Sequence, residues 1–218
     1  MTLLMPGGVC MSEKHIEMCL SKHYNKKIQL SLTQIEAIAC AIVSRGPNAN
    51  VLIFGCGNDS ALWHALNPDG YTLFVENSRT WADEMKKLNS ELNIQHYYYP
   101  TEIRVGNSIP IDLSSLRRVK TPKWISDRMW DVVLVDGPAG YKAEAPGRAL
   151  PIYWASRFSS KSSHVFVDDS ERSLERQYSD HFLGPRYTQV IELYRVAGAN
   201  QRLRWFLGSS MRSVASEG

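Results

Sequence analysis

The feature that most constrains the fold is residues 51–60, which read VLIFGCGNDS. The run of four apolar residues at its start is typical of a short strand buried on both faces of a parallel sheet. Gly55 and Gly57 then permit a tight turn, and residues 58–60 are all of types favoured at the start of a helix. A strand, a glycine turn and a helix N-terminus together form the backbone cradle of nucleotide-binding α/β folds.

The spacing around this turn indicates the kind of nucleotide. A dinucleotide-binding turn reads Gly-x-Gly-x-x-Gly, whereas this chain has Ser60 in the third glycine position. Glu76 follows a second predicted strand, about 20 residues after the turn, where a carboxylate can accept hydrogen bonds from ribose hydroxyls. The combination favours S-adenosylmethionine; a plain strand-to-helix turn beside a solvated glutamate is the alternative. The predicted cofactor-binding residues are Gly55, Cys56, Gly57, Asn58, Ser60, Glu76 and Asp136.

Composition limits the class of protein. The chain has 218 residues, of which 44% are hydrophobic and 22% charged, so it can form one domain with its own core and is not largely disordered. A dispersed net charge of +3 gives no basis for nucleic-acid binding. The four cysteines lack zinc-site spacing, which predicts free thiols in a reducing compartment. No apolar stretch approaches the roughly 18 residues of a membrane span, and we expect a cytoplasmic protein of undetermined oligomeric state.

The hydrophobic pattern predicts an alternation of strands and helices. The expected strands are residues 51–54, 71–75, 94–99, 131–135 and 164–167, followed by a hairpin of residues 187–196 and 202–207. This order predicts a Rossmann-like S-adenosylmethionine-dependent methyltransferase fold, with a mostly parallel, doubly wound α/β sheet and an antiparallel C-terminal hairpin. The expected organisation is an N-terminal arm or lid at 1–30, a methyltransferase domain at 31–210 and a tail at 211–218.

Capping patterns predict where helices begin. Thr33 and Thr80 each start a capping-box pattern, with an acidic residue three positions later, and Ser170 is placed to cap the helix after the fifth strand. Residues 102–128 contain two prolines and show no clear period. They predict a long connection over the surface.

Three aspartates follow two further predicted strands: Asp136, Asp168 and Asp169. The carboxyl ends of parallel strands meet at the sheet edge where ligands bind, so these side chains are expected to converge. Carboxylate oxygens suit Mg²⁺, Mn²⁺ or Co²⁺. The alternative is that Asp168 or Asp169 caps a helix and Asp136 binds the loop, and the sequence leaves both open. Without a metal, one aspartate must serve as general base.

Further motifs carry a family resemblance. They are residues 54–63 (FGCGNDSALW), 74–76 (FVE), 135–141 (VDGPAGY), 145–148 (APGR), 152–153 (IY) and 167–169 (VDD). From Leu30 to Phe206 the chain resembles the plant DUF579 polysaccharide-biosynthesis family, which includes the glucuronoxylan 4-O-methyltransferases. The resemblance implies an enzyme that uses S-adenosylmethionine to methylate O-4 of glucuronic acid on xylan. Asn58 and Asp168 stand where the family usually has histidine, and plant members carry an N-terminal membrane anchor.

We therefore predict an O-methyltransferase whose acceptor is a glucuronic acid residue or a uronic acid glycoside. The predicted catalytic residues are Asp136, Asp168 and Arg148. Arg148 is expected in a flexible loop, where it would hold the acceptor carboxylate, with Lys142 as second candidate and a solvated loop arginine as the alternative. The other functions left open are a metal-dependent O-methyltransferase of another small molecule, an NAD(P)-dependent oxidoreductase and a noncatalytic component of a polysaccharide-synthesis complex.

Overall fold

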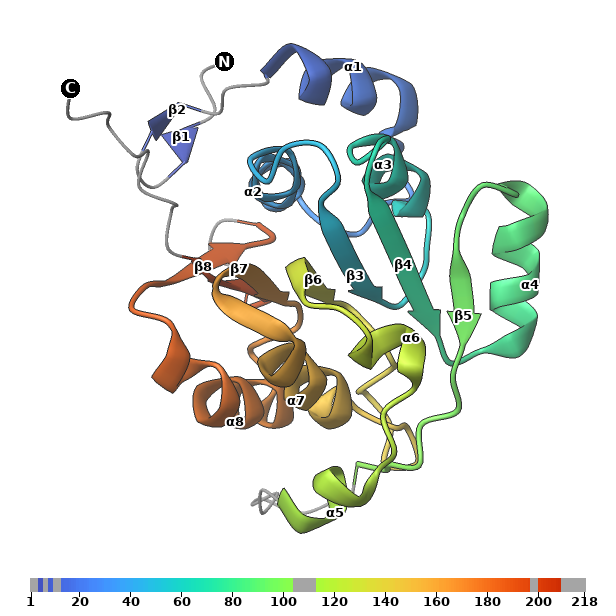
Figure 1. The fold of residues 1–218 in the computed structure, drawn as a ribbon, viewed down its shortest axis with the longest axis vertical. Helices are drawn as coiled ribbons and strands as arrows, with labels where there is room; N and C mark the ends of the chain where they lie inside the picture. Colours follow the sequence, from blue (N-terminus) through green and yellow to red (C-terminus); the bar gives the residue numbers. More distant parts are fainter. Residues whose placement is uncertain (1–3, 6–7, 10–12, 104–112, 197–199, 209–218) are drawn as a thin grey trace.

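The computed structural model describes residues 4–5, 8–9, 13–103, 113–196 and 200–208. A seven-stranded sheet forms the centre of this described part (Figure 1). The parallel strands are β3 (Asn50–Phe54), β4 (Tyr71–Glu76), β5 (Ile94–His96), β6 (Trp130–Val135) and β7 (Ser159–Val167), in the spatial order β5-β4-β3-β6-β7. The antiparallel strands are β8 (Val190–Tyr194) and β9 (Arg202–Phe206). Strand β9 pairs with both β7 and β8, which leaves β8 at the edge. The predicted mostly parallel sheet with an antiparallel C-terminal hairpin is confirmed.

Helices cover both faces of this sheet. On one face lie α1 (Glu13–His23), α2 (Leu32–Val43), α3 (Ser60–Ala65) and α4 (Arg79–Leu88). On the other lie α5 (Leu113–Arg118), α6 (Lys123–Ser126), α7 (Ala149–Phe158) and α8 (Ser173–Phe182). A short helix, η1 (Gly184–Arg186), and a separate pair of strands, β1 (Leu4–Met5) and β2 (Gly8–Val9), complete the described elements.

The sheet separates two buried clusters because successive residues of a strand point to opposite faces. In β3, Val51 and Ile53 pack toward α1–α4, and Leu52 and Phe54 pack toward α5–α8. This is why the central strands are mostly apolar. Helix α1 lies within the predicted arm, and its buried Ile16 joins the same cluster as α2 and α3. No helix in the described ranges is long and apolar enough to cross a membrane.

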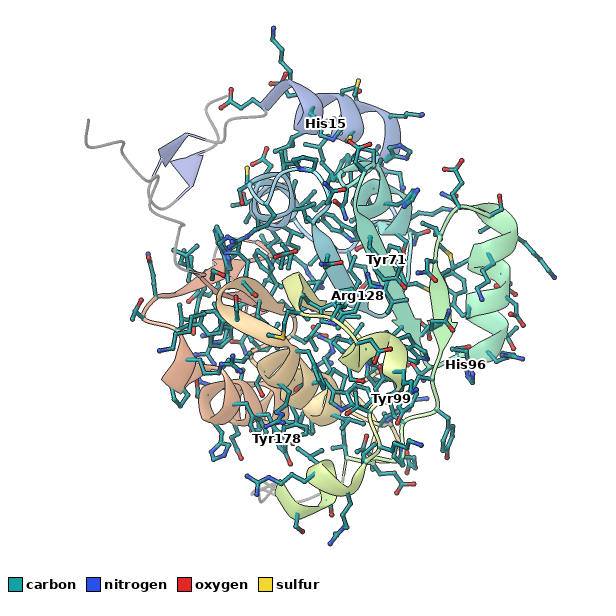
Figure 2. The ribbon with its side chains drawn as sticks, viewed as in Figure 1. His15, Tyr71, His96, Tyr99, Arg128 and Tyr178 are labelled. Carbon is teal, nitrogen blue, oxygen red and sulfur yellow. The ribbon has the colours of Figure 1, made fainter. Side chains whose placement is uncertain are left out.

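The register of the strands aligns their carboxyl ends. Phe54 pairs with Val75 on one side and with Val135 on the other, and Val135 pairs with Val167. The residues that follow or end these strands therefore meet at one edge of the sheet. At the start of β4, the guanidinium of Arg128 lies 3.8 Å from the ring centroid of Tyr71 (Figure 2), so this cation packs near the opposite edge.

Each of the three predicted caps is wrong by two residues. Helix α2 begins with a capping box between Ser31 and Gln34, and α4 is capped by Ser78. Both serines have extended backbone, so their hydroxyls reach the N–H three residues ahead, whereas the predicted threonines are already helical. Ser170 donates to the carbonyl of Arg202 instead of capping α8.

The predicted surface connection at 102–128 contains the short helices α5 and α6 in its described part, and residues 104–112 lie outside that part. Of the four cysteines, Cys19 and Cys40 are buried and Cys56 is partly buried, and none of these three is in a disulfide within the described residues. Cys10 and the predicted tail at 211–218 lie outside the described residues, as does most of the hairpin connection.

Candidate active site

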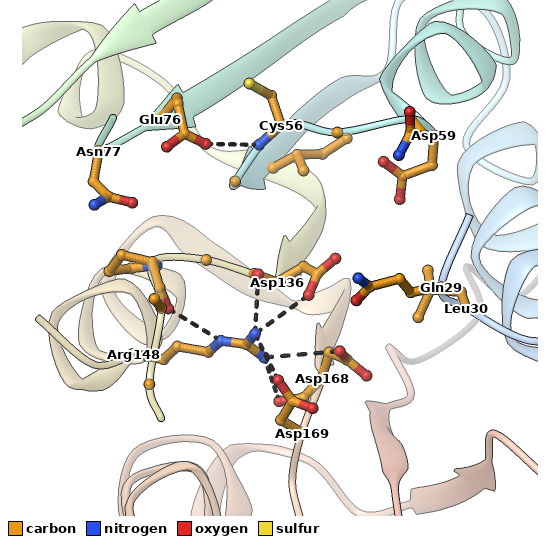
Figure 3. Close-up of a pocket in the computed structure, with 18 of the residues that line it drawn as sticks. Gln29, Leu30, Cys56, Asp59, Glu76, Asn77, Asp136, Arg148, Asp168 and Asp169 are labelled. Carbon is orange, nitrogen blue, oxygen red and sulfur yellow. Dashed lines mark hydrogen bonds and ion pairs between the residues drawn. The ribbon is translucent and has the colours of Figure 1, made fainter. Parts of the chain in front are cut away.

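A cavity of about 410 Å³ opens at the carboxyl edge of the sheet. Its walls come from the residues that follow β3, β4, β6 and β7 and from residues 27–30, which join α1 to α2. Figure 3 shows Glu76 and Asn77 on one side of the cavity and Asp136, Arg148 and Asp168 on the other. The predicted cofactor residues Gly55, Cys56, Gly57, Asn58, Glu76 and Asp136 all line this cavity, and Ser60 lies just behind it.

The glycine loop, residues 55–59, passes very close to the loop that follows β6. Gly55 has a φ of +103°, and a Cβ on it would lie 3.3 Å from the backbone of Asp136 and Gly137. A Cβ on Gly137 would lie 2.8 Å from the Cα of Gly55. Glycine at both positions thus lets the two loops touch, which brings Asp136 beside the cofactor-type turn.

Hydrogen bonds fix the shape of the glycine loop. The buried carboxylate of Glu76 accepts from the backbone N–H of Cys56 at 3.2 Å and of Ser78 at 2.7 Å. Ser60 accepts from the N–H of Gly57 at 2.9 Å. Burial and the neighbouring Glu76 raise the pKa of the Cys56 thiol, so this cysteine stays protonated at neutral pH. The loop is therefore held by a group at the end of β4 and a group at the start of α3.

The connection between α1 and α2 closes the cavity from the side. Asn25 donates to the carbonyl of Asn58 and Asn58 donates to the carbonyl of Lys27, each at 3.4 Å. Gln29 and Leu30 reach the cavity wall from this connection (Figure 3). The predicted arm at 1–30 thus contributes to the wall through its last four residues.

Asp136, Arg148, Asp168 and Asp169 form one group of charges, called here the arginine–aspartate cluster. Arg148, only 4% exposed, ion-pairs with Asp169 at 2.8 Å, with Asp136 at 3.3 Å and with Asp168 at 3.9 Å. Its guanidinium also donates to the backbone carbonyls of Asp168 (2.7 Å) and Asp136 (3.0 Å). Burial alone would lower the pKa of Arg148, but the surrounding carboxylates raise it, so the cation is permanent.

The carboxylates of this cluster differ in what surrounds them. Asp136 lines the cavity with 34% of its side chain exposed, and burial together with the charge of Asp168 raises its pKa well above the ordinary range. Burial also raises the pKa of Asp168, against the opposing effect of Arg148. One oxygen of Asp168, Oδ1, is buried and has no hydrogen bond to a described residue. These two groups are the proton-accepting candidates of the site.

The expected position of Arg148 is wrong. Instead of standing in a flexible loop, it precedes α7 and fills the space between the three aspartates. It reaches them across 12 to 21 residues of sequence, a contact that no local pattern reveals. Lys142, the second candidate, is exposed and lies over the Tyr141 ring at 5.7 Å from its centroid.

The three aspartates converge as predicted, but with arginines between them. Asp169 ion-pairs with Arg148 at 2.8 Å and with Arg172 at 2.9 Å. Asp168 ion-pairs with Arg195 at 3.4 Å. Within the described ranges, no group of three or more His, Cys, Asp and Glu side chains is arranged to hold a metal ion. The predicted three-carboxylate ligand set is therefore not the arrangement that the structure assembles.

Several cavity residues were not predicted from the sequence: Lys27, Gln29, Asp59, Asn77, Trp81, Arg172 and Arg195. Asp59 follows the glycines directly, so its position in the motif could have indicated it. Burial raises the pKa of its carboxyl. Trp81 lies on α4 and donates from its ring nitrogen to the carbonyl of Cys56 at 2.7 Å. The position of Trp81 in the helical pattern predicts only packing against the core, so the sequence does not indicate this hydrogen bond.

Comparison with known proteins places the chain in a family. The IRX15/IRX15L/GXM family model matches residues 33–110 and 106–193. Glucuronoxylan 4-O-methyltransferase 2 of Arabidopsis thaliana is 32% identical over 171 residues, which cover 67% of this chain and 58% of that protein. Arabinogalactan O-methyltransferase 1 of the same plant is 32% identical over 188 residues, covering 73% and 63%. The chain thus spans less than two thirds of the length of these relatives.

Among solved structures, a TehB-like methyltransferase from Corynebacterium glutamicum aligns with a TM-score of 0.49 and 13% identity, over 92% of this chain and 98% of that one. The family match is the finding that carries weight, because its residues include the glycine loop, Glu76 and the arginine–aspartate cluster. The DUF579 resemblance seen in the sequence motifs is confirmed. The chain belongs to the IRX15/IRX15L/GXM family.

Proposed function

We propose that the protein is an S-adenosylmethionine-dependent O-methyltransferase that acts on a sugar hydroxyl, O-4 of a glucuronic acid residue or of a uronic acid glycoside. The observation that carries the proposal is one cavity with a glycine loop and Glu76 at one end and the partly exposed Asp136 at the other. Relatives that are named for glucuronoxylan 4-O-methylation and arabinogalactan O-methylation support a carbohydrate acceptor.

The cofactor end fits an adenosyl ligand. The close approach of Gly55 to Gly137 leaves a backbone surface that a side chain would obstruct. Glu76 lines the cavity, where its carboxylate can accept from ribose hydroxyls, and Asn77 lies beside it (Figure 3). When bound, S-adenosylmethionine supplies an electrophilic methyl group on a positively charged sulfur. We assign Gly55, Cys56, Gly57, Asn58 and Glu76 to its binding, with Ser60 holding the loop from behind.

The acceptor end fits proton removal by Asp136. A sugar hydroxyl is a poor nucleophile at neutral pH, so a base must take its proton as the new bond to the methyl carbon forms. Asp136 faces the cavity, and burial beside Asp168 raises the pKa of its carboxyl, which makes it a stronger base than an ordinary aspartate. Arg148 holds that carboxylate in place through Oδ1 at 3.3 Å and so acts as a positioning residue. Asp168 lines the same cavity, and burial raises the pKa of its carboxyl, so it is the second candidate to take the proton.

A divalent ion (Mg²⁺, Mn²⁺ or Co²⁺) is the alternative way to activate the hydroxyl. The candidate ligands are Asp136 and Oδ1 of Asp168, because the arginines contact Oδ2 of Asp168 and leave Oδ1 without a hydrogen bond to a described residue. A bound ion would lower the pKa of the hydroxyl and orient it. Activity measured after exhaustive chelation, and again after each ion is added back, separates this alternative from general-base catalysis.

The proposed function is tested by binding and by turnover. We expect S-adenosylhomocysteine to bind in a calorimetric titration and NAD not to bind. We expect the protein to transfer a methyl group from S-adenosylmethionine to glucuronosyl oligosaccharides, with NMR of the product locating the methyl on O-4. Binding of neither ligand, with no transfer to any glucuronosyl acceptor, would favour the alternative of a noncatalytic component of a polysaccharide-synthesis complex. The predicted cytoplasmic location is tested separately, by imaging the tagged protein.

A further inference from the structure

Arg148 has no free edge to offer an acceptor. Its Nε donates to the carbonyl of Pro138, its Nη1 to the carbonyl of Asp168, and its Nη2 to Asp136 and Asp169. All three nitrogens of the guanidinium are thus bound within the protein. A carboxylate on the acceptor must be met by another cation of the cavity wall, which means Lys27, Arg172 or Arg195.

Arg172 is the cation with an available edge. Its side chain is 31% exposed, lines the cavity and ion-pairs with Asp169 through Nη2 at 2.9 Å. In the described part of the chain, neither its Nε nor its Nη1 makes a hydrogen bond. Arg195, in contrast, is 18% exposed and uses Nη2 for Asp168 and Nη1 for Gln201. Lys27 belongs to the wall beside Asn58, at the cofactor end.

The surroundings of Arg172 fix its position against the cavity. Asp169 has a φ of +52°, a backbone conformation that non-glycine residues rarely adopt, and its Oδ2 binds both Arg148 and Arg172. A Cβ on Gly140 would lie 2.7 Å from Oε1 of Glu175 and 3.2 Å from Nη1 of Arg172, so the backbone of Gly140 packs closely against both side chains. The next residue, Tyr141, lines the cavity and is 71% exposed, which places the mouth of the cavity on this side.

We propose that Arg172 binds the carboxylate of the acceptor and thereby selects uronic acids over neutral sugars. The proposal rests on the proposed function, because it concerns the acceptor of the same site. Arginine suits the role because its planar guanidinium offers two parallel donors to a carboxylate. The carboxylate and the 4-hydroxyl of glucuronic acid are on neighbouring ring carbons. An ion-pair chain from Arg172 through Asp169 and Arg148 to Asp136 therefore fixes the acceptor's anchor and its base relative to each other.

The test compares three acceptors that differ at one group: a methyl glucuronoside, its uncharged methyl ester and the corresponding glucoside. We expect Arg172→Ala to raise the KM for the glucuronoside about ten- to a hundredfold, as expected for one charge-assisted contact, and to leave the ester and the glucoside unchanged. Arg172→Lys should recover part of the loss. The matched control is Arg176→Ala. Arg176 lies in α8, the helix that Arg172 precedes, is 47% exposed and pairs with Glu192 outside the cavity.

Two results would overturn the proposal while leaving the methyltransferase function intact. One is an equal loss for charged and uncharged acceptors in Arg172→Ala, which would mean that Arg172 only holds Asp169. The other is an intact enzyme that methylates all three acceptors equally well. Saturation-transfer NMR, with S-adenosylhomocysteine present, measures binding of the glucuronoside and so tests the role of Arg172 even without turnover. Unchanged binding in Arg172→Ala contradicts the proposal, whereas failure of S-adenosylhomocysteine to bind the intact protein contradicts the proposed function.

Discussion

At the scale of single residues, the site depends on carboxylates with different partners. Glu76 receives two backbone N–H groups, Asp169 receives two arginines, and Asp136 keeps part of its surface in the cavity. The same chemical group can therefore shape a loop, anchor cations or take up a proton. What decides between these roles is the set of neighbours that the fold supplies.

Glu76→Ala should weaken the binding of S-adenosylhomocysteine about tenfold or more. The substitution removes the charged acceptor for the ribose, a contact worth about 1.5–3 kcal/mol. Calorimetric titration measures the loss, and thermal unfolding reports how far the glycine loop depends on the same side chain. Asp83→Ala, at an exposed position of α4, is the matched control. An unchanged dissociation constant in Glu76→Ala would remove this residue from the cofactor site.

Asp136→Asn should lower the rate of methyl transfer about 10²- to 10⁴-fold, because an amide cannot accept the proton of the hydroxyl. Binding of S-adenosylhomocysteine should change little. In the intact protein the rate should rise with pH through the raised pKa of Asp136, since only the ionised carboxylate is a base. A variant that kept both the full rate and the same pH profile would show that another group takes the proton.

At the scale of elements, the contact between the glycine loop and the loop after β6 is what joins the two ends of the cavity. Gly137→Ala should destabilise the protein by about 1–3 kcal/mol, because the added methyl would meet the backbone of Gly55 at 2.8 Å. Gly184→Ala is the control, since a Cβ there has no neighbour within 4 Å. Denaturant unfolding compares the two variants, and equal stabilities would mean that the loops separate at little cost.

The elements also show where sequence patterns stop being informative. Strands are predicted well, because a short apolar run between turn residues is typical of a strand buried on both faces of a sheet. The start of α2 is ambiguous, because both Ser31-x-x-Gln34 and Thr33-x-x-Glu36 satisfy the same capping pattern. Only the path of the preceding chain decides between them. The position of Arg148 was predicted wrongly for a different reason, because its burial depends on partners far away in sequence.

At the scale of the whole molecule, the sequence predicts the sheet and the strand ends that carry the site. Glu76, Asp136, Asp168 and Asp169 are all predicted at one edge, and they lie there in the structure. The arm or lid predicted at 1–30 forms part of the cavity wall through residues 27–30, but the sequence does not indicate which of its residues do so, because this segment has no periodic pattern. Arg172 and Arg195 were missed because a lone arginine in a loop carries no signal of its own.

Stability of the whole molecule should depend on pH through Glu175. This side chain of α8 is fully buried, its carboxylate oxygens have no hydrogen bond to a described residue, and burial raises its pKa above the ordinary 4.5. The folded protein therefore keeps this proton to a higher pH than the unfolded chain does. Between pH 4.5 and the raised pKa, this group makes the free energy of unfolding fall as pH rises.

Glu175→Gln should remove that part of the pH dependence. Urea unfolding at a series of pH values gives the free energy for both proteins, and the difference between them should change across this range. Glu84→Gln, at an exposed position of α4, should leave the profile of the intact protein unaltered. A Glu175→Gln profile parallel to that of the intact protein would contradict the assignment.

The place of β9 in the sheet has a consequence for how the protein is made. In the described sheet, β8 pairs only with β9, and β9 alone connects it to β7. During synthesis β8 emerges first, yet it cannot join the sheet until β9 has followed it. Arg195 lies just after β8, so its ion pair with Asp168 is made only when the completed hairpin docks. The nascent chain thus finishes its charged site last, in the slow step of forming long-range strand pairs.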